Sequence, residues 1–182
     1  MKWKLIALAL GVFIVFWIFL SSQIGGSPFH WRSQQDVIQE IFTGSNIFNV
    51  VMSSPQVTGQ ILKNDPEDGF PLLAGDNKYK PVILSPDQTQ DFKELFDKPS
   101  SYVWGITSEC TIQYGVVFDF RSGGHTVRVA LCFHCHMMGI FEGDGEKAKN
   151  VSGFMLSDPM RKQLMALCKT LFPNDPKIQA LK

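Results

Sequence analysis

Concentrated charge of either sign is missing from this 182-residue chain. Lys and Arg together number 17, Asp and Glu also number 17, and no long run of like charge occurs. A nucleic-acid-binding surface needs a clustered positive field. We therefore expect no nucleic-acid partner.

The sequence also lacks the signature motifs of several enzyme classes. It has no Gly-x-Ser-x-Gly elbow, no phosphate-binding glycine loop and no His-Glu-x-x-His motif. Asp119 and Asp144 have no acidic partner at a spacing typical of paired general acid and base. These absences favour a non-enzymatic role.

Polar side chains are absent from residues 5–20, which read LIALALGVFIVFWIFL. As a helix this stretch spans roughly 24 Å, a little less than the hydrocarbon core of a bilayer. Trp3, Lys4 and the serines at 21 and 22 extend it. We interpret residues 1–22 as a transmembrane anchor that contacts lipid through residues 3–22, and a cleaved signal peptide is the alternative.

Two lysines precede the apolar segment and fix its expected orientation. Lys2 and Lys4 favour a cytoplasmic N-terminus, so the remainder is expected in the periplasm or outside the cell. Residues 23–44 are expected to form a tether with a short helix. Residues 45–182 then form a single extracytoplasmic domain, a comfortable length for one core.

Two helices have clear start signals. Ser85 and Gln88 match a capping box with proline at the first helical position, which predicts a helix over residues 86–96. A second helix is predicted from residues 157–159 to just before Pro173. Its apolar residues recur at three- and four-residue spacing, so one side should face a core.

Strand patterns fill the region between these helices. Residues 121–124 hold two glycines and predict a hairpin turn, and residues 47–62 suggest two short strands around another turn. Further strands are predicted over residues 111–120, 125–135, 137–142 and 151–155. The expected fold is α+β: a small antiparallel sheet, with a meander over residues 110–142, and two main helices packed on one face.

Four cysteines follow the apolar segment, and three lie in or near the meander. In an exported domain they are expected to form disulfides. If residues 121–124 form the turn, Cys110 lies opposite Cys135, and a tighter turn shifts the partner by two residues. We expect a bridge from Cys110 to either Cys135 or Cys132. Cys168 lies on the apolar side of the last predicted helix and is expected to be buried.

The segment from Cys132 to His136 has other interpretations. Cys132, His134, Cys135 and His136 include the ligand types of zinc and copper sites. The order Cys132-x-x-Cys135-His136 also matches c-type haem attachment. A third alternative is thiol–disulfide redox chemistry, for which Cys-x-x-Cys is the usual spacing. The leading interpretation, a structural disulfide, needs no cofactor.

The order of these features resembles a known family. A capped helix (SPDQTQDFKELF), an isolated Cys110, a strand pair, LCFHC and a final helix ending in LFPNDPKIQAL are similar to uncharacterised exported, membrane-anchored bacterial proteins. Members carry a Cys-x-x-Cys late in a β meander and a C-terminal helix ending in Phe-Pro. They tend to have an acidic residue where this chain has His136, which implies that the haem match is accidental. The resemblance assigns no functional residue.

Overall fold

The computed structural model describes residues 38, 42, 45–62, 80–103, 110, 112–143 and 148–182. All of them belong to one compact unit, Gln34–Lys182. The expected anchor at residues 1–22 lies outside the described residues, as does the tether at 23–44 except for Ile38 and Phe42. No helix in the described part of the chain is long and apolar enough to cross a membrane.

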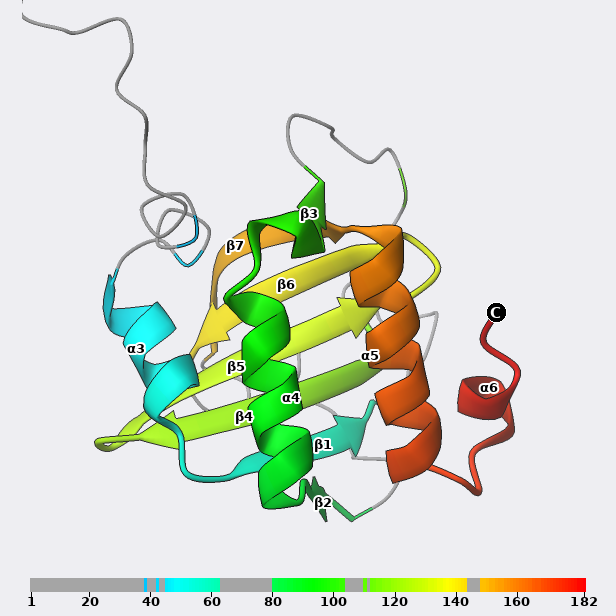
Figure 1. The fold of residues 1–182 in the computed structure, drawn as a ribbon, viewed down its shortest axis with the longest axis horizontal. Coiled ribbons are helices and arrows are strands. Elements are labelled where there is room, and N and C mark those ends of the chain that lie inside the picture. Colours follow the sequence, from blue (N-terminus) through cyan, green and yellow to red (C-terminus); the bar gives the residue numbers. More distant parts are fainter. Residues whose placement is uncertain are drawn as a thin grey trace, which may run out of the picture. The chain divides into compact units, whose positions relative to one another are not determined.

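The fold is α+β, built on a seven-stranded antiparallel sheet in the order β2-β1-β4-β5-β6-β7-β3. Figure 1 shows α4 and α5 lying across one face of this sheet. The strands are β1 (Val57–Ile61), β2 (Val82–Ile83), β3 (Tyr102–Val103), β4 (Val116–Ser122), β5 (His125–Cys132), β6 (Met137–Glu142) and β7 (Lys149–Leu156). The helices are α3 (Ser45–Ser53), α4 (Pro86–Phe96), α5 (Asp158–Leu171) and α6 (Pro176–Gln179), with a 3-10 turn at Pro99–Ser101.

Helix α4 starts and ends where the sequence predicted. The Ser85 hydroxyl accepts a hydrogen bond from the Gln88 N–H (3.2 Å), and the Gln88 side chain accepts one from the Ser85 N–H (2.9 Å). These bonds satisfy backbone donors that a helix start leaves unpaired. Helix α5 also begins as predicted, after the N-cap Ser157.

Aromatic rings hold α4 against the sheet. The Phe92 ring lies 4.5 Å from that of Phe118 and 5.5 Å from that of Phe120, both on β4. Phe96 continues the cluster at 5.0 Å from Phe92. Each of these four rings is fully buried, so they are a main source of the hydrophobic stabilisation on this face.

The turn between β4 and β5 uses fewer residues than the four, 121–124, that the sequence offered for it. Only Gly123 (φ 58°) and Gly124 (φ 80°) lie outside the strands, and Ser122 pairs with His125. Positive φ at both central positions suits a two-residue hairpin and favours glycine. This turn fixes the register of the two central strands.

Within residues 45–120 the structure corrects one predicted strand to a helix and moves the start of another. Within residues 47–62 the first element is helix α3, because Ile47, Phe48 and Val51 are buried at helical spacing. The strand predicted over residues 111–120 begins only at Val116. Directly before it, Gly115 still donates to the Leu131 carbonyl and accepts from the Leu62 N–H, and the Tyr114 ring packs near Gly139 of β6.

A buried ion pair lies on that second face, away from α4 and α5. Arg128 of β5 donates two hydrogen bonds to Asp119 of β4, at 2.5 Å and 2.9 Å. Asp119 is 1% exposed and Arg128 6%. Gln60 of β1 donates a further bond to Asp119 at 3.4 Å. The pair is flanked by the buried apolar residues Leu62, Val117, Ala130 and Phe141.

Replacing Asp119 with asparagine should strongly destabilise the domain. The Asp119→Asn substitution leaves the buried Arg128 guanidinium without its counter-charge, a change that typically costs about 3 kcal/mol or more. Urea unfolding followed by circular dichroism measures this loss. Asp91→Asn, on the exposed side of α4, is the matched control and should leave the free energy of unfolding unchanged. Equal stability of the two variants would contradict the assigned role of the ion pair.

Candidate functional site

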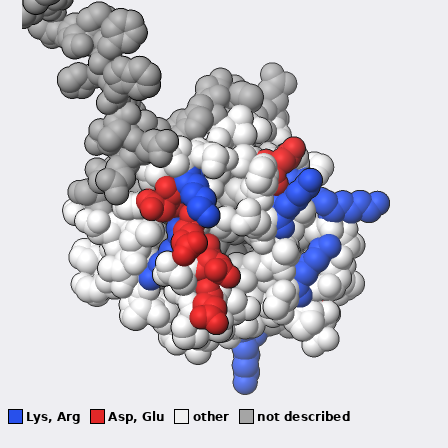
Figure 2. Space-filling view, in the orientation of Figure 1, with Lys and Arg blue, Asp and Glu red and all other residues white. Residues whose placement is uncertain are grey.

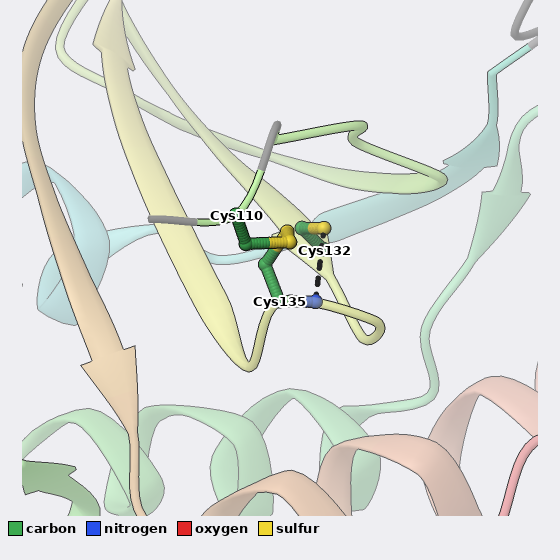
Figure 3. Close-up of a disulfide and its surroundings, with 3 residues drawn as sticks. All are labelled: Cys110, Cys132 and Cys135. Atoms are coloured by element: carbon green, nitrogen blue, oxygen red, sulfur yellow. Dashed lines mark hydrogen bonds between the residues drawn. A yellow bond between two sulfur atoms is a disulfide. The ribbon is translucent and has the colours of Figure 1, made fainter. Parts of the chain in front are cut away.

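A disulfide joins Cys110 to Cys135, with their Cα atoms 5.7 Å apart. It is one of the two pairings that the sequence left open. Cys110 precedes β4, and Cys135 lies in the turn of residues 133–136 between β5 and β6 (Figure 3). The bridge therefore links the two open ends of the β4–β5 hairpin.

The turn at residues 133–136 corrects the predicted strand over residues 125–135. Strand β5 ends at Cys132, which pairs with Met137 across the turn. His136 has a φ of 54°, which is uncommon for a residue with a side chain. The Leu156 N–H holds the turn by donating to the His136 carbonyl at 2.7 Å. The bridge is thus a contact between a loop and a turn, whereas the cross-strand argument assumed two paired strands.

Cys132 carries a free thiol beside the disulfide. Its Sγ accepts a hydrogen bond from the Cys135 main-chain N–H, with 3.4 Å between sulfur and nitrogen (Figure 3). Cys132 is 1% exposed and Cys135 5%, whereas Cys110 is half-buried. Residues three apart on a regular strand point to opposite faces, so the turn at residues 133–136 is what brings Cys132 and Cys135 together.

Tyr114 lies near one member of the cysteine cluster, which we define as Cys110, Cys132 and Cys135. Burial raises the pKa of the Tyr114 hydroxyl, and negative charge on Cys132 raises it further. The ring lies 5.6 Å from that of Phe141, edge to face. Sequence reasoning missed Tyr114. The available signal was Gly139, because a glycine inside a strand often marks a close approach by another group.

The arrangement does not fit the predicted metal or haem sites. Cys135 is held in the disulfide, which removes one of the two thiols that haem attachment requires. His134 is exposed, and both His134 and His136 lie in the turn and not on a strand. Within the described ranges, no three His, Cys, Asp or Glu side chains are grouped to hold a metal ion.

Cys168 lies apart from the cysteine cluster, in the core beneath α5. It is fully buried among apolar side chains, as its place on the apolar side of the helix predicted. Burial raises the pKa of its thiol above the ordinary value of 9.0. This thiol therefore stays protonated at neutral pH and acts as a small apolar group.

A groove of about 490 Å³ lies between α4 and α5 on the outer side of the helical layer. Phe92 and Leu95 contribute to its lining, and Asp91, Glu94 and Lys98 are its charged residues. Figure 2 shows acidic side chains along α4 and basic ones on the α5 side. The mixed charge of this face does not select one class of ligand.

The cysteine cluster is thus the part of the described chain with the most distinctive chemistry: a disulfide with a free thiol beside it. Comparisons with models of protein families, with curated protein sequences and with solved structures find no match to this chain. Any role for the cluster has to follow from these side chains.

Adding a methyl group at Gly139 should disrupt the packing of Tyr114 against β6. A Cβ there would lie 2.7 Å from Tyr114 Cζ and 2.9 Å from Phe141 Cε2, closer than such atoms approach. Gly139→Ala should cost about 1–3 kcal/mol, the usual range for overpacking. Gly115→Ala is the control, because its Cβ would meet nothing within 4 Å. If thermal unfolding shows equal midpoints for both variants, the Tyr114 ring does not lie against Gly139.

Cys168 should resist alkylation in the folded protein. Because its folded pKa lies above that of the unfolded thiol, the unfolded chain ionises first as pH rises, and the free energy of unfolding falls above about pH 9. Iodoacetamide at pH 8, followed by mass spectrometry, should leave Cys168 unmodified in buffer and modify it in urea. Equal labelling rates under both conditions would show that the thiol is accessible.

Proposed function

We propose that this chain is a membrane-anchored, non-enzymatic protein whose domain lies outside the cytoplasm and is stabilised by a structural disulfide. The observation that carries the proposal is the Cys110–Cys135 bridge. Disulfides form and persist in the periplasm and other oxidising compartments, and they are rare in the cytosol.

The N-terminal sequence supports the same compartment. Residues 5–20 are apolar throughout, and Lys2 and Lys4 precede them. This charge distribution favours a cytoplasmic N-terminus with the following domain exported. The resemblance to exported bacterial proteins with a late Cys-x-x-Cys agrees with this location.

The bridge suits a structural role because of what it encloses. It joins residues 25 positions apart and closes a loop that contains both central strands, β4 and β5. In the chain-entropy model, closing a loop of this length stabilises the folded state by about 3.5 kcal/mol. Cys135 is buried, which shields that half of the bridge from reductants in solution.

Protease accessibility and thiol counting test the proposal together. The full chain would be produced in an export-competent bacterium, and spheroplasts treated with protease. We expect the domain to be digested from outside and the intact chain to stay in the membrane fraction after an alkaline carbonate wash. Non-reducing peptide mapping should show the Cys110–Cys135 bridge.

The double variant Cys110→Ser/Cys135→Ser tests the location of the domain and its stability separately. It should reach the same location but unfold at lower urea concentration, because the loop closure is lost. Cys168→Ser is not a suitable control, because it would place a hydroxyl in the core. Cys132→Ala is used as the control instead. A protease-protected domain whose Cys110 and Cys135 are both free thiols would refute the proposed compartment and the structural bridge.

A further inference from the structure

We infer that the cysteine cluster undergoes an internal thiol–disulfide exchange: Cys132 attacks Cys135, forms a Cys132–Cys135 bridge and releases Cys110 as a free thiol. This activity goes beyond a structural role for the disulfide. It rests on the Cys110–Cys135 bridge of the proposed function, and it does not depend on the membrane anchor.

The turn at residues 133–136 brings the attacking and receiving residues together. Cys132 Sγ already contacts the main-chain nitrogen of Cys135 at 3.4 Å. Only the Cα and Cβ of Cys135 separate that nitrogen from the disulfide sulfur, so a rotation of the Cys132 side chain is a short path to attack. Cys135 is therefore the natural centre of the exchange, with Cys132 on one side and Cys110 on the other (Figure 3).

The step balances without an external oxidant or reductant. The Cys132 thiol loses its proton to solvent, and the thiolate attacks Sγ of Cys135. The bond between the sulfurs of Cys135 and Cys110 breaks, its electron pair leaves on Cys110, and that sulfur takes up a proton. One disulfide forms as another breaks, so the oxidation state of the protein does not change.

The Cys135 main-chain N–H positions the attacking residue. It donates to Cys132 Sγ at 3.4 Å, and this hydrogen bond is present in the bridged state, before any exchange. It therefore holds the Cys132 sulfur beside Cys135, the residue that it attacks.

Exchange also moves the free thiol to a more accessible place. Cys132 is buried, whereas Cys110 is half-buried. After exchange, the thiol available to a partner is the one on Cys110, outside the strands. The chemical class that fits it is a small or peptide disulfide such as oxidised glutathione, which a Cys110 thiolate would attack to form a mixed disulfide while releasing one reduced glutathione.

The first test follows the position of the free thiol over time in the full-length wild-type protein. Samples at pH 7, 8 and 9 would be quenched with acid, labelled with N-ethylmaleimide in urea at pH 6.5 and mapped by mass spectrometry. We expect label on Cys132 at the start and a growing fraction on Cys110. The initial rate should rise with pH, because the thiolate is the form of a cysteine that attacks a disulfide.

Cys132→Ser is the matched control, because it keeps the Cys110–Cys135 bridge and removes only the nucleophile. Its bridge should stay unchanged at every pH. With oxidised glutathione present, wild-type Cys110 should become glutathionylated at pH 9, and Cys110 of the control should not. A second variant, Cys110→Ser, should form the Cys132–Cys135 bridge after oxidation.

Two results would overturn the exchange. One is a wild-type protein that keeps all label on Cys132 after hours at pH 9. The other is a Cys110→Ser protein that unfolds cooperatively but keeps Cys132 and Cys135 as thiols in oxidised glutathione. Cys132 would then be a buried apolar side chain only. Failure of the proposed function would give a different result: the Cys110–Cys135 bridge would be absent before any incubation.

Discussion

The register of the β4–β5 hairpin decides which side chain faces which layer of this domain. Gly123 and Gly124 turn the chain in two residues, and every residue of the two strands then has a fixed partner. Phe118 and Phe120 consequently face α4, and Asp119 between them faces the opposite layer beside Arg128. A slip of one residue would exchange these faces and place the charged pair among the phenylalanines.

The open end of the same hairpin carries the chemistry. Strand β5 ends at Cys132, and the turn that follows presents Cys135 to Cys110, which precedes β4. The tight glycine turn at one end and the disulfide at the other thus hold the two central strands in one alignment. Attack of the Cys132 thiol on the disulfide would release the Cys110–Cys135 bridge. The glycine turn would stay in place.

Local signals in the sequence predicted the helices well and the cysteine geometry less well. The capping residues of α4 and α5 act within a few residues of each helix, so sequence alone identifies both starts. The β-branched residues in 47–62 favoured a strand, but the chain forms α3 there, because burial of Ile47, Phe48 and Val51 at helical spacing decides the element. The turn at residues 133–136 could not be foreseen, because it contains no glycine and relies on a positive φ at His136. The Asp119–Arg128 pair was predictable only once the two-glycine register was known.

The disulfide also changes how the chain would carry a mechanical load. A force applied to the two ends of the protein passes from Cys110 directly to Cys135 through the sulfur atoms, bypassing the segment between them. That segment, which holds β4 and β5, would otherwise add roughly 80 Å when fully extended. The central hairpin therefore remains a closed covalent ring under tension, and stretching releases length only from the elements outside it.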